Sequence, residues 1–324
     1  MSDHLRCHTS IINESSKVTA ISCKPNNHVV ASVALFCKSY SRDVHRAKRL
    51  VDSIEAYNSD HIPFFLGVPQ QDLPLFRNVV GSMRCEWVTD EDICTANPKA
   101  TVARLRGMDG RIAQQVIKSE FWRLIACNAY MALDSDAYFI KDFRESDFLH
   151  PDGHPYTVLH QGKEYLQTAI NRNRVATFEY FLRESEAMKL EFGRTGPNYD
   201  FGPAPLLWSP AVWRSLDEYH LSPKGEMLWD AIARIPSEIR WYGEALLAFK
   251  AIPLAPIDPL FRVYHHDWQY FTLRGQGENE QNLCSQFLGV IFQSNWDKRL
   301  DSASARKPLA SRLWKNIKSM RHRY

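Results

Sequence analysis

The chain has 324 residues, 44% of them hydrophobic and 24% charged, a balance that is ordinary for a globular protein with a sizeable core. The net charge of +3 is too small to indicate nucleic acid as a partner. No run approaches the roughly 20 apolar residues of a membrane span. The seven cysteines are odd in number and include no CxxC pair. They predict a reduced, cytosolic protein with neither structural zinc nor a disulfide framework.

The first half of the chain alternates buried apolar runs with amphipathic segments. After a polar, variable lead-in over residues 1–27, we predict a strand at 28–37, a helix at 39–57, a strand at 62–69, a helix at 72–80, and a strand that runs into an acidic loop at 85–92. A helix at 109–130 and a strand at 130–136 follow. Strands that alternate with helices indicate a parallel, Rossmann-like sheet. Ligands of such sheets bind beyond the carboxyl ends of the strands, so we expect the chemistry at that edge.

The second half is more irregular. We predict helices from near Pro210, at 225–235 and at 243–252, a strand at 260–271, and a helix or a strand and loop at 282–296. The sequence contains no repeats, low-complexity tracts or clear linker, which favours one domain over residues 28–300.

The tail, residues 301–324, has a different character. From Arg306 onward it carries seven lysines and arginines and no acidic residue. One helical stripe joins its apolar residues, which are Leu309, Leu313, Trp314, Ile317 and Met320. A basic amphipathic helix with a tryptophan is typical of a peripheral contact with an anionic membrane, here through residues 306–324. The alternative is a terminal helix that docks on the body by its apolar stripe, with the basic face in water.

Two aspartates, Asp134 and Asp136, stand near the end of the apolar run "YMALDSDAYFI" at 130–140. Residues i and i+2 of a strand point to the same face, so the two carboxylates should repel each other unless a cation or a proton lies between them. Hard oxygen ligands suit Mg²⁺ or Mn²⁺, which often take further ligands from substrate phosphates. We therefore predict a divalent-metal site that also holds a nucleotide diphosphate. The alternative is a strand-end turn in which one aspartate caps the next helix.

A mostly polar helix face precedes these aspartates. Arg111, Gln115, Lys118 and Trp122 are spaced to share one side of the helix predicted at 109–130. This face is either turned to a ligand beside the aspartates or solvated.

Six motifs, in order along roughly residues 33–296, carry a resemblance to a class of enzymes. They are QQVIK, LDSDAYFI, PAPLLWS, SEIRWYGEALL, HHDWQ and GVIFQSNW. Together they resemble the GT-A class of nucleotide-sugar-dependent glycosyltransferases, and most closely a bacterial family with many members described only as proteins of unknown function. The resemblance implies an α/β fold with a GT-A-like, Rossmann-type mixed sheet flanked by helices. It makes residues 28–145 the nucleotide-binding half and residues 146–300 the acceptor-binding half.

The resemblance also implies a metal and donor site. Asp134 and Asp136 match the metal- and ribose-binding DxD motif, with Asp136 the better candidate for direct metal ligation. A histidine that completes the metal site is matched by His265 or His266. Further donor contacts would come from Gln115 and Lys118, and from Ser39, Tyr40 and Arg42 beside the nucleotide base.

A general base is implied in the motif SEIRWYGEALL, as Glu238 or Glu244. If the base is Glu244, its predicted place at a helix start favours the ionised form. Asp200 and Asp267 are competing candidates. Because retaining enzymes of this fold need no such base, the sequence leaves both stereochemical outcomes open.

These features predict a metal-dependent glycosyltransferase that moves a sugar from a nucleotide-sugar donor to a glycan or glycolipid acceptor. Such an enzyme would act in the assembly of cell-surface polysaccharide or lipopolysaccharide, in the cytoplasm or peripherally on the inner face of the cytoplasmic membrane. Two other functions compete with this one. A non-catalytic relative would bind a sugar nucleotide or scaffold an assembly. A phosphotransferase of the haloacid-dehalogenase type would use the first aspartate as a nucleophile, although that class usually carries its DxD near the start of the fold.

Overall fold

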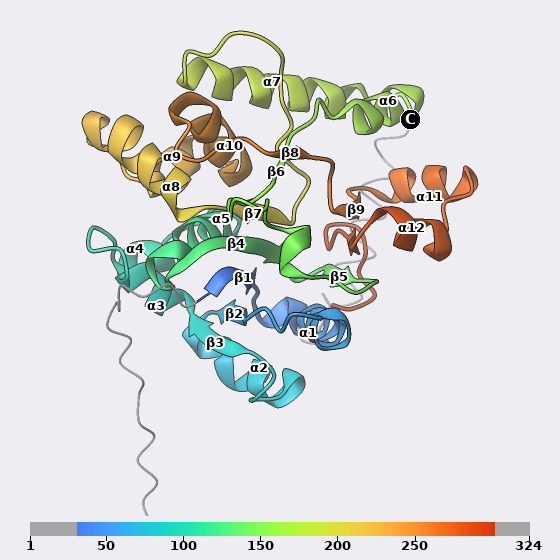
Figure 1. Ribbon diagram of the computed structural model, residues 1–324, viewed down its shortest axis with the longest axis horizontal. Helices are drawn as coiled ribbons and strands as arrows, with labels where there is room; N and C mark the ends of the chain where they lie inside the picture. The colour runs from blue at the N-terminus through green and yellow to red at the C-terminus, as the bar shows by residue number, and fades with distance from the viewer. Residues whose placement is uncertain (1–30, 302–324) are drawn as a thin grey trace, which may run out of the picture.

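The computed structural model describes residues 31–301, and the lead-in at 1–27 and the basic helix predicted beyond Arg306 lie outside this range. Its central element is a five-stranded sheet in the order β3–β2–β1–β4–β7 (Figure 1). Neighbouring strands are parallel except β7, which runs antiparallel to β4. The strands are β1 (Ala31–Lys38), β2 (Phe64–Val68), β3 (Glu86–Thr89), β4 (Cys127–Asp134) and β7 (Leu206–Trp208). This mixed sheet with helices on both faces confirms the predicted fold class.

Both faces of the sheet are buried, which explains why β1 and β4 read as continuous apolar runs. Along β1, Ala34 and Phe36 pack into one core, whereas Val33 and Leu35 pack into the other. The first core is completed by α3 (Asp90–Thr95), α4 (Val102–Arg106), α5 (Gly110–Glu120), α8 (Pro210–Leu216), α9 (Leu228–Arg234) and α10 (Glu238–Phe249). The second core is completed by α1 (Val44–Tyr57) and α2 (Leu73–Val80).

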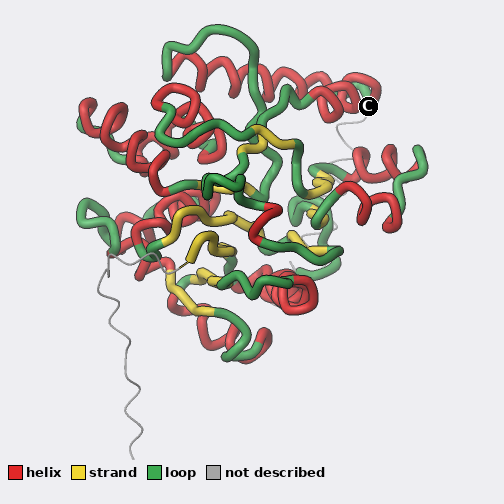
Figure 2. The backbone as a smooth tube through the Cα atoms, in the orientation of Figure 1, coloured by secondary structure: helices red, strands yellow, loops and turns green. Residues whose placement is uncertain are grey.

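Smaller elements extend the molecule beyond this sheet, as the strands and helices of Figure 2 show. A three-stranded sheet has the order β5–β10–β9, and a separate pair joins β6 to β8. The strands are β5 (Ala137–Phe139), β6 (Thr157–Val158), β8 (Pro256–Ile257), β9 (Phe261–Tyr264) and β10 (Gly289–Phe292). The helices are α6 (Lys163–Asn171), α7 (Val175–Glu191), α11 (Asp267–Gly275) and α12 (Glu280–Gln286). Within the described range, no helix is both long and apolar enough to cross a membrane.

Two predicted boundaries in the first half are wrong. Helix α5 ends at Glu120 and β4 begins at Cys127, although the apolar stripe predicted a helix as far as residue 130. Cys127 and Ala129 lie two residues apart, a spacing that also suits a buried strand. The acidic stretch after β3 is a helix rather than a loop, because Thr89 and Asp92 form a capping box that starts α3.

Three differences concern the second half. The strand predicted at 260–271 is the short β9 followed by α11. Helix α10 begins at Glu238, five residues before the predicted start at 243. The successive helices α6 and α7 were not predicted.

Candidate active site

A cavity of about 2450 Å³ opens at the carboxyl ends of the parallel strands. Lys38 at the end of β1, Asp134 at the end of β4 and Asp90 directly after β3 all line it. The opposite wall comes from α6, α7 and the start of α10. The cavity therefore lies at the edge of the sheet where the sequence predicted the chemistry.

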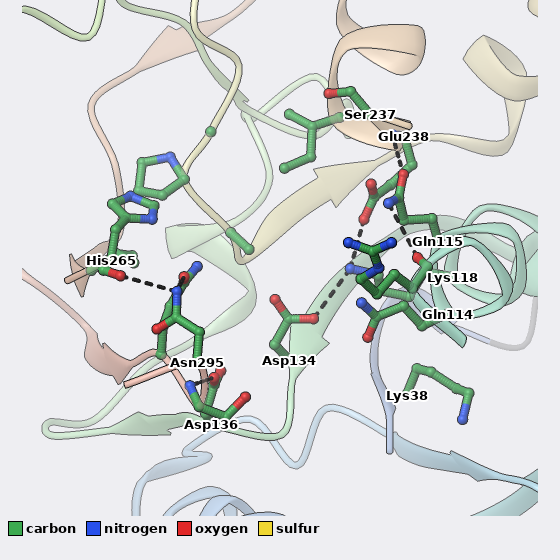
Figure 3. Close-up of a pocket in the computed structure, with 18 of the residues that line it drawn as sticks. Lys38, Gln114, Gln115, Lys118, Asp134, Asp136, Ser237, Glu238, His265 and Asn295 are labelled. Carbon is green, nitrogen blue, oxygen red and sulfur yellow. Dashed lines mark hydrogen bonds and ion pairs between the residues drawn. The ribbon is translucent and has the colours of Figure 1, made fainter. Parts of the chain in front are cut away.

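Lys118 of α5 lines this cavity and lies between two carboxylates (Figure 3). Its Nζ is 2.7 Å from Glu238 Oε1 and 3.1 Å from Asp134 Oδ1. Gln115, one turn earlier, accepts a hydrogen bond from the backbone N–H of Glu238 (3.3 Å). Burial alone lowers the pKa of Lys118, but the charges of Asp134 and Glu238 outweigh this effect and raise it above its ordinary value. Lys118 is therefore a permanent buried cation.

Asp136 has a different environment. Its Oδ2 accepts a hydrogen bond from the backbone N–H of Ser294 (2.7 Å), whereas its buried Oδ1 has no partner among the described residues. Burial, and then the nearby charge of Asp134, raise the pKa of Asp136 from 3.8 to about 7. A buried carboxylate oxygen without a partner is costly, and it is free to bind a ligand that brings positive charge or a proton.

The two aspartates do not share one strand face, so that prediction is wrong. Asp134 is the last residue of β4, and Asp136 lies in the turn between β4 and β5. The turn separates their partners: Asp134 is directed toward Lys118, and Asp136 lies beside Asn295 on the other side of the cavity (Figure 3). The alternative, in which an aspartate caps a helix, is not seen, because a strand follows the turn.

A second buried ion pair lies in the same cavity and was missed in the sequence. Lys38 Nζ is 3.1 Å from Asp90 Oδ2, and Asp90 Oδ1 has no partner in the described part of the chain. Burial raises the pKa of Asp90 to about 6, and Lys38 limits the rise. The signal for Lys38 was a single charged residue at the end of a strand whose five preceding residues are all apolar. No local signal distinguished Asp90 from its acidic neighbours.

The two histidines both line the cavity. His266 Nε2 shares a hydrogen bond with Tyr165 Oη (3.2 Å), and its ring stacks on that of Trp268. Burial lowers the pKa of His265 to about 4, so its ring is neutral at physiological pH. Within residues 31–301, no group of three or more His, Cys, Asp or Glu side chains is placed to hold a metal ion. The predicted set of Asp134, Asp136 and a histidine is therefore brought to one cavity but not into one cluster.

Of the three residues predicted near the nucleotide base, one lines the cavity and two do not. Tyr40 lines the cavity and is partly exposed. Ser39 is buried, and its N–H donates to the carbonyl of Gly67 (2.8 Å). Arg42 pairs with Asp301 (3.3 Å). Neither Ser39 nor Arg42 is among the residues that line the cavity.

The two predicted bases are also separated. Glu238 lines the cavity and opens α10, as expected of a helix start. Glu244 lies in the middle of α10, so its predicted place at a helix start is wrong. It is not part of the cavity wall, and both its oxygens are bound by Arg194 (2.5 and 2.6 Å). Of the competing carboxylates, Asp200 lines the cavity and Asp267 does not.

Comparison with known proteins places the sequence in a family. Residues 27–251 match the model of a family of unknown function, DUF6492. The chain belongs to this family. No curated protein matches it significantly.

Several solved structures are similar to this DUF6492 chain. They include the bifunctional glycosyltransferase WbbM in its apo form (9% identity, TM-score 0.49, over 90% of this chain and 52% of that one). The chain thus spans about half the length of WbbM. The others are the galactosyltransferase LgtC in complex with donor and acceptor sugar analogues (11% identity, TM-score 0.47, over 86% of this chain and 99% of that one) and mouse xyloside xylosyltransferase 1 in its apo form (10% identity, TM-score 0.44, over 83% and 99%).

The charges in the cavity of this DUF6492 member decide what it can bind. Around Lys118, one cation faces two carboxylates, and Asp136 adds a third acidic group nearby. A bare diphosphate would meet an excess of negative charge there. A diphosphate that arrives with a divalent cation would not, because the cation supplies the positive charge that this wall lacks.

Proposed function

We propose that this protein is a metal-dependent glycosyltransferase that moves a sugar from a nucleotide-sugar donor to the hydroxyl group of a glycan or glycolipid acceptor. The observation that carries the proposal is the cavity at the strand ends. There the buried Lys118 joins Asp134 to Glu238, and Asp136, whose Oδ1 has no partner among the described residues, lines the same cavity. A role in the assembly of surface polysaccharide or lipopolysaccharide is the pathway that we infer for it.

The donor would extend from Lys38 and Asp90 to Lys118. Asp90 offers an unpartnered acceptor oxygen beside the ammonium group of Lys38, a pair that suits a base with an N–H next to a carbonyl group. Tyr40 lies on the same part of the wall and offers a ring face to the base or ribose. The diphosphate would then lie near Lys118 and the two aspartates.

Asp134 and Asp136 would hold the divalent cation, Mg²⁺ or Mn²⁺. The unpartnered Asp136 Oδ1 fits this role, and a site with two protein carboxylates is typical of an ion that takes its other ligands from substrate phosphates and water. When bound, the cation stabilises the negative charge that develops on the diphosphate leaving group. Lys118 adds a fixed positive charge on the other side of Asp134.

Glu238 is the carboxylate that we propose as general base in an inverting reaction. It lines the cavity and lies at a helix start, whereas both oxygens of Glu244 are bound to Arg194. A general base must reach the acceptor hydroxyl, and Glu244 is not in the cavity wall. A retaining reaction would leave Glu238 a positioning residue that holds Lys118.

The test is a thermal-shift screen of nucleotides and sugar nucleotides, each with and without Mn²⁺. It uses the wild type, Asp136→Ala, and the control Asp142→Ala, which changes an exposed aspartate outside the cavity wall. We expect a metal-dependent rise in melting temperature for one nucleotide series, lost in Asp136→Ala and kept in the control. Hydrolysis of the same donor with Mn²⁺ would then establish turnover. Nucleotide binding without hydrolysis or transfer would favour the non-catalytic alternative, and the absence of any nucleotide shift would overturn the proposal.

A further inference from the structure

Residues 170–176 comprise the end of α6, the turn that follows it and the start of α7. All seven residues are exposed. Their backbone is nevertheless held by hydrogen bonds from the N–H of Asn173 to the carbonyl of Ile170 (2.9 Å) and from the N–H of Arg174 to the carbonyl of Ala169 (2.8 Å). Asn173 takes the left-handed conformation (φ 51°) that ends α6. The turn therefore presents its side chains to solvent in a defined arrangement.

These side chains combine apolar and basic character. Ile170 and Val175 are 52% and 54% exposed, which is high for aliphatic residues so close in one turn. Arg172 and Arg174 lie between them, and neither is within 4.0 Å of a carboxylate oxygen of the described range. The turn contains no acidic residue. Single exposed aliphatic residues are common on protein surfaces, but two of them with two unpaired guanidinium groups form an amphiphilic tip.

This tip lies at the rim of the cavity. Ala176 at its end and the next residue, Thr177, both in α7, line the cavity, as does Tyr165 in α6. Figure 1 shows α6 and α7 at the opposite end of the molecule from α2, where the sheet and its helices do not cover them.

We propose that residues 170–175 dock on the surface of an anionic lipid bilayer. Aliphatic side chains that enter the headgroup region gain from burial of apolar area, and arginines beside them are attracted to anionic lipids. This occupant fits both halves of the tip, because an acidic protein partner would satisfy the arginines but not require the exposed aliphatic pair. Docking would bring the rim of the cavity to the membrane. An enzyme docked in this way would take an acceptor that is carried on a lipid. That consequence rests on the proposed function, whereas the docking itself does not.

The test is co-sedimentation of the full chain with vesicles of phosphatidylcholine and phosphatidylglycerol in equal parts, against phosphatidylcholine alone. The tip variants are Ile170→Asp with Val175→Asp, and Arg172→Gln with Arg174→Gln. The matched control, Arg77→Gln with Met83→Asp, changes one exposed arginine and one exposed apolar residue on α2 and the loop after it.

We expect the wild type to bind the anionic vesicles, and each tip variant to bind about tenfold more weakly or worse. The control should bind like the wild type, and all variants should keep its melting temperature because the substituted side chains are exposed. Unchanged binding of the tip variants would overturn the proposal, whatever other segment then holds the membrane. So would a wild type that binds neither vesicle. Loss of vesicle binding with intact nucleotide binding would separate this inference from the proposed function.

Discussion

Removal of Lys118 tests the central feature of the site most directly. In Lys118→Met the stem is kept and the charge is lost, so Glu238 and Asp134 face each other without their cation. The side chains of Lys118 and Glu238 are 8% and 7% exposed, so water screens their 2.7 Å contact little. Asp134 is 34% exposed and contributes less. Since loss of one partner leaves a buried charge uncompensated, we expect a loss of about 3–5 kcal/mol in the free energy of unfolding.

The assay is urea unfolding followed by the fluorescence of the nine tryptophans. Glu238→Gln in the Lys118→Met background removes the uncompensated charge, so the double variant should recover at least about 2 kcal/mol. The raised pKa of Lys118 means that its contribution is complete below pH 10 and falls only at higher pH. The difference from wild type should therefore be the same at pH 7 and pH 9. A single variant that loses less than about 1 kcal/mol, or a double variant without recovery, would refute this reasoning.

Three further predictions concern other parts of the chain. Because burial raises the pKa of Asp90 to about 6, the wild type should lose stability as the pH rises from about 4 to 6, and Asp90→Asn should lose less; parallel pH profiles of melting temperature would contradict this. Arg194→Met should cost about 3–5 kcal/mol by leaving Glu244 buried without its partner, yet leave nucleotide binding intact in the thermal-shift assay. Gly243→Ala should cost about 1–3 kcal/mol in urea unfolding, since its Cβ would overlap the ring of Phe201; wild-type stability would show that α10 can shift.

The elements that the sequence predicted correctly are those whose signal is local. The runs of β1 and β4 are buried on both faces, and α1 buries one clear stripe, so their composition reports their surroundings. Helix α7 gives no such signal, because only three of its 17 residues, Phe181, Ser185 and Met188, are buried. The start of α10 was placed too late for a related reason. Glu238 and Arg240 are buried by ion pairs, and polar residues at a helix start read as a loop.

Several residues of the site could be predicted, but the contacts between them could not. Asp134, Lys118 and Gln115 were named because a strand end and a helix face are visible in the sequence. Their connection to Glu238 joins residues more than a hundred positions apart, and no periodicity reports such a contact. The same holds for the backbone N–H of Ser294, which decides where Asp136 points.

The negative charges of Asp134 and Asp136, which are separated by one residue in the sequence, are thus accommodated in two different ways. Asp134 is paired with a buried ammonium group that stays charged. Asp136 receives only a backbone N–H on one oxygen, and its pKa rises to about 7, so at neutral pH it is shared between its ionised and protonated forms. The repulsion between the two carboxylates that the sequence predicted is therefore compensated at one of them and not at the other. Lys118 balances the charge of Asp134, whereas the charge of Asp136 has no cationic partner. Asp136 is therefore the place where an added cation would change the electrostatics of the cavity most.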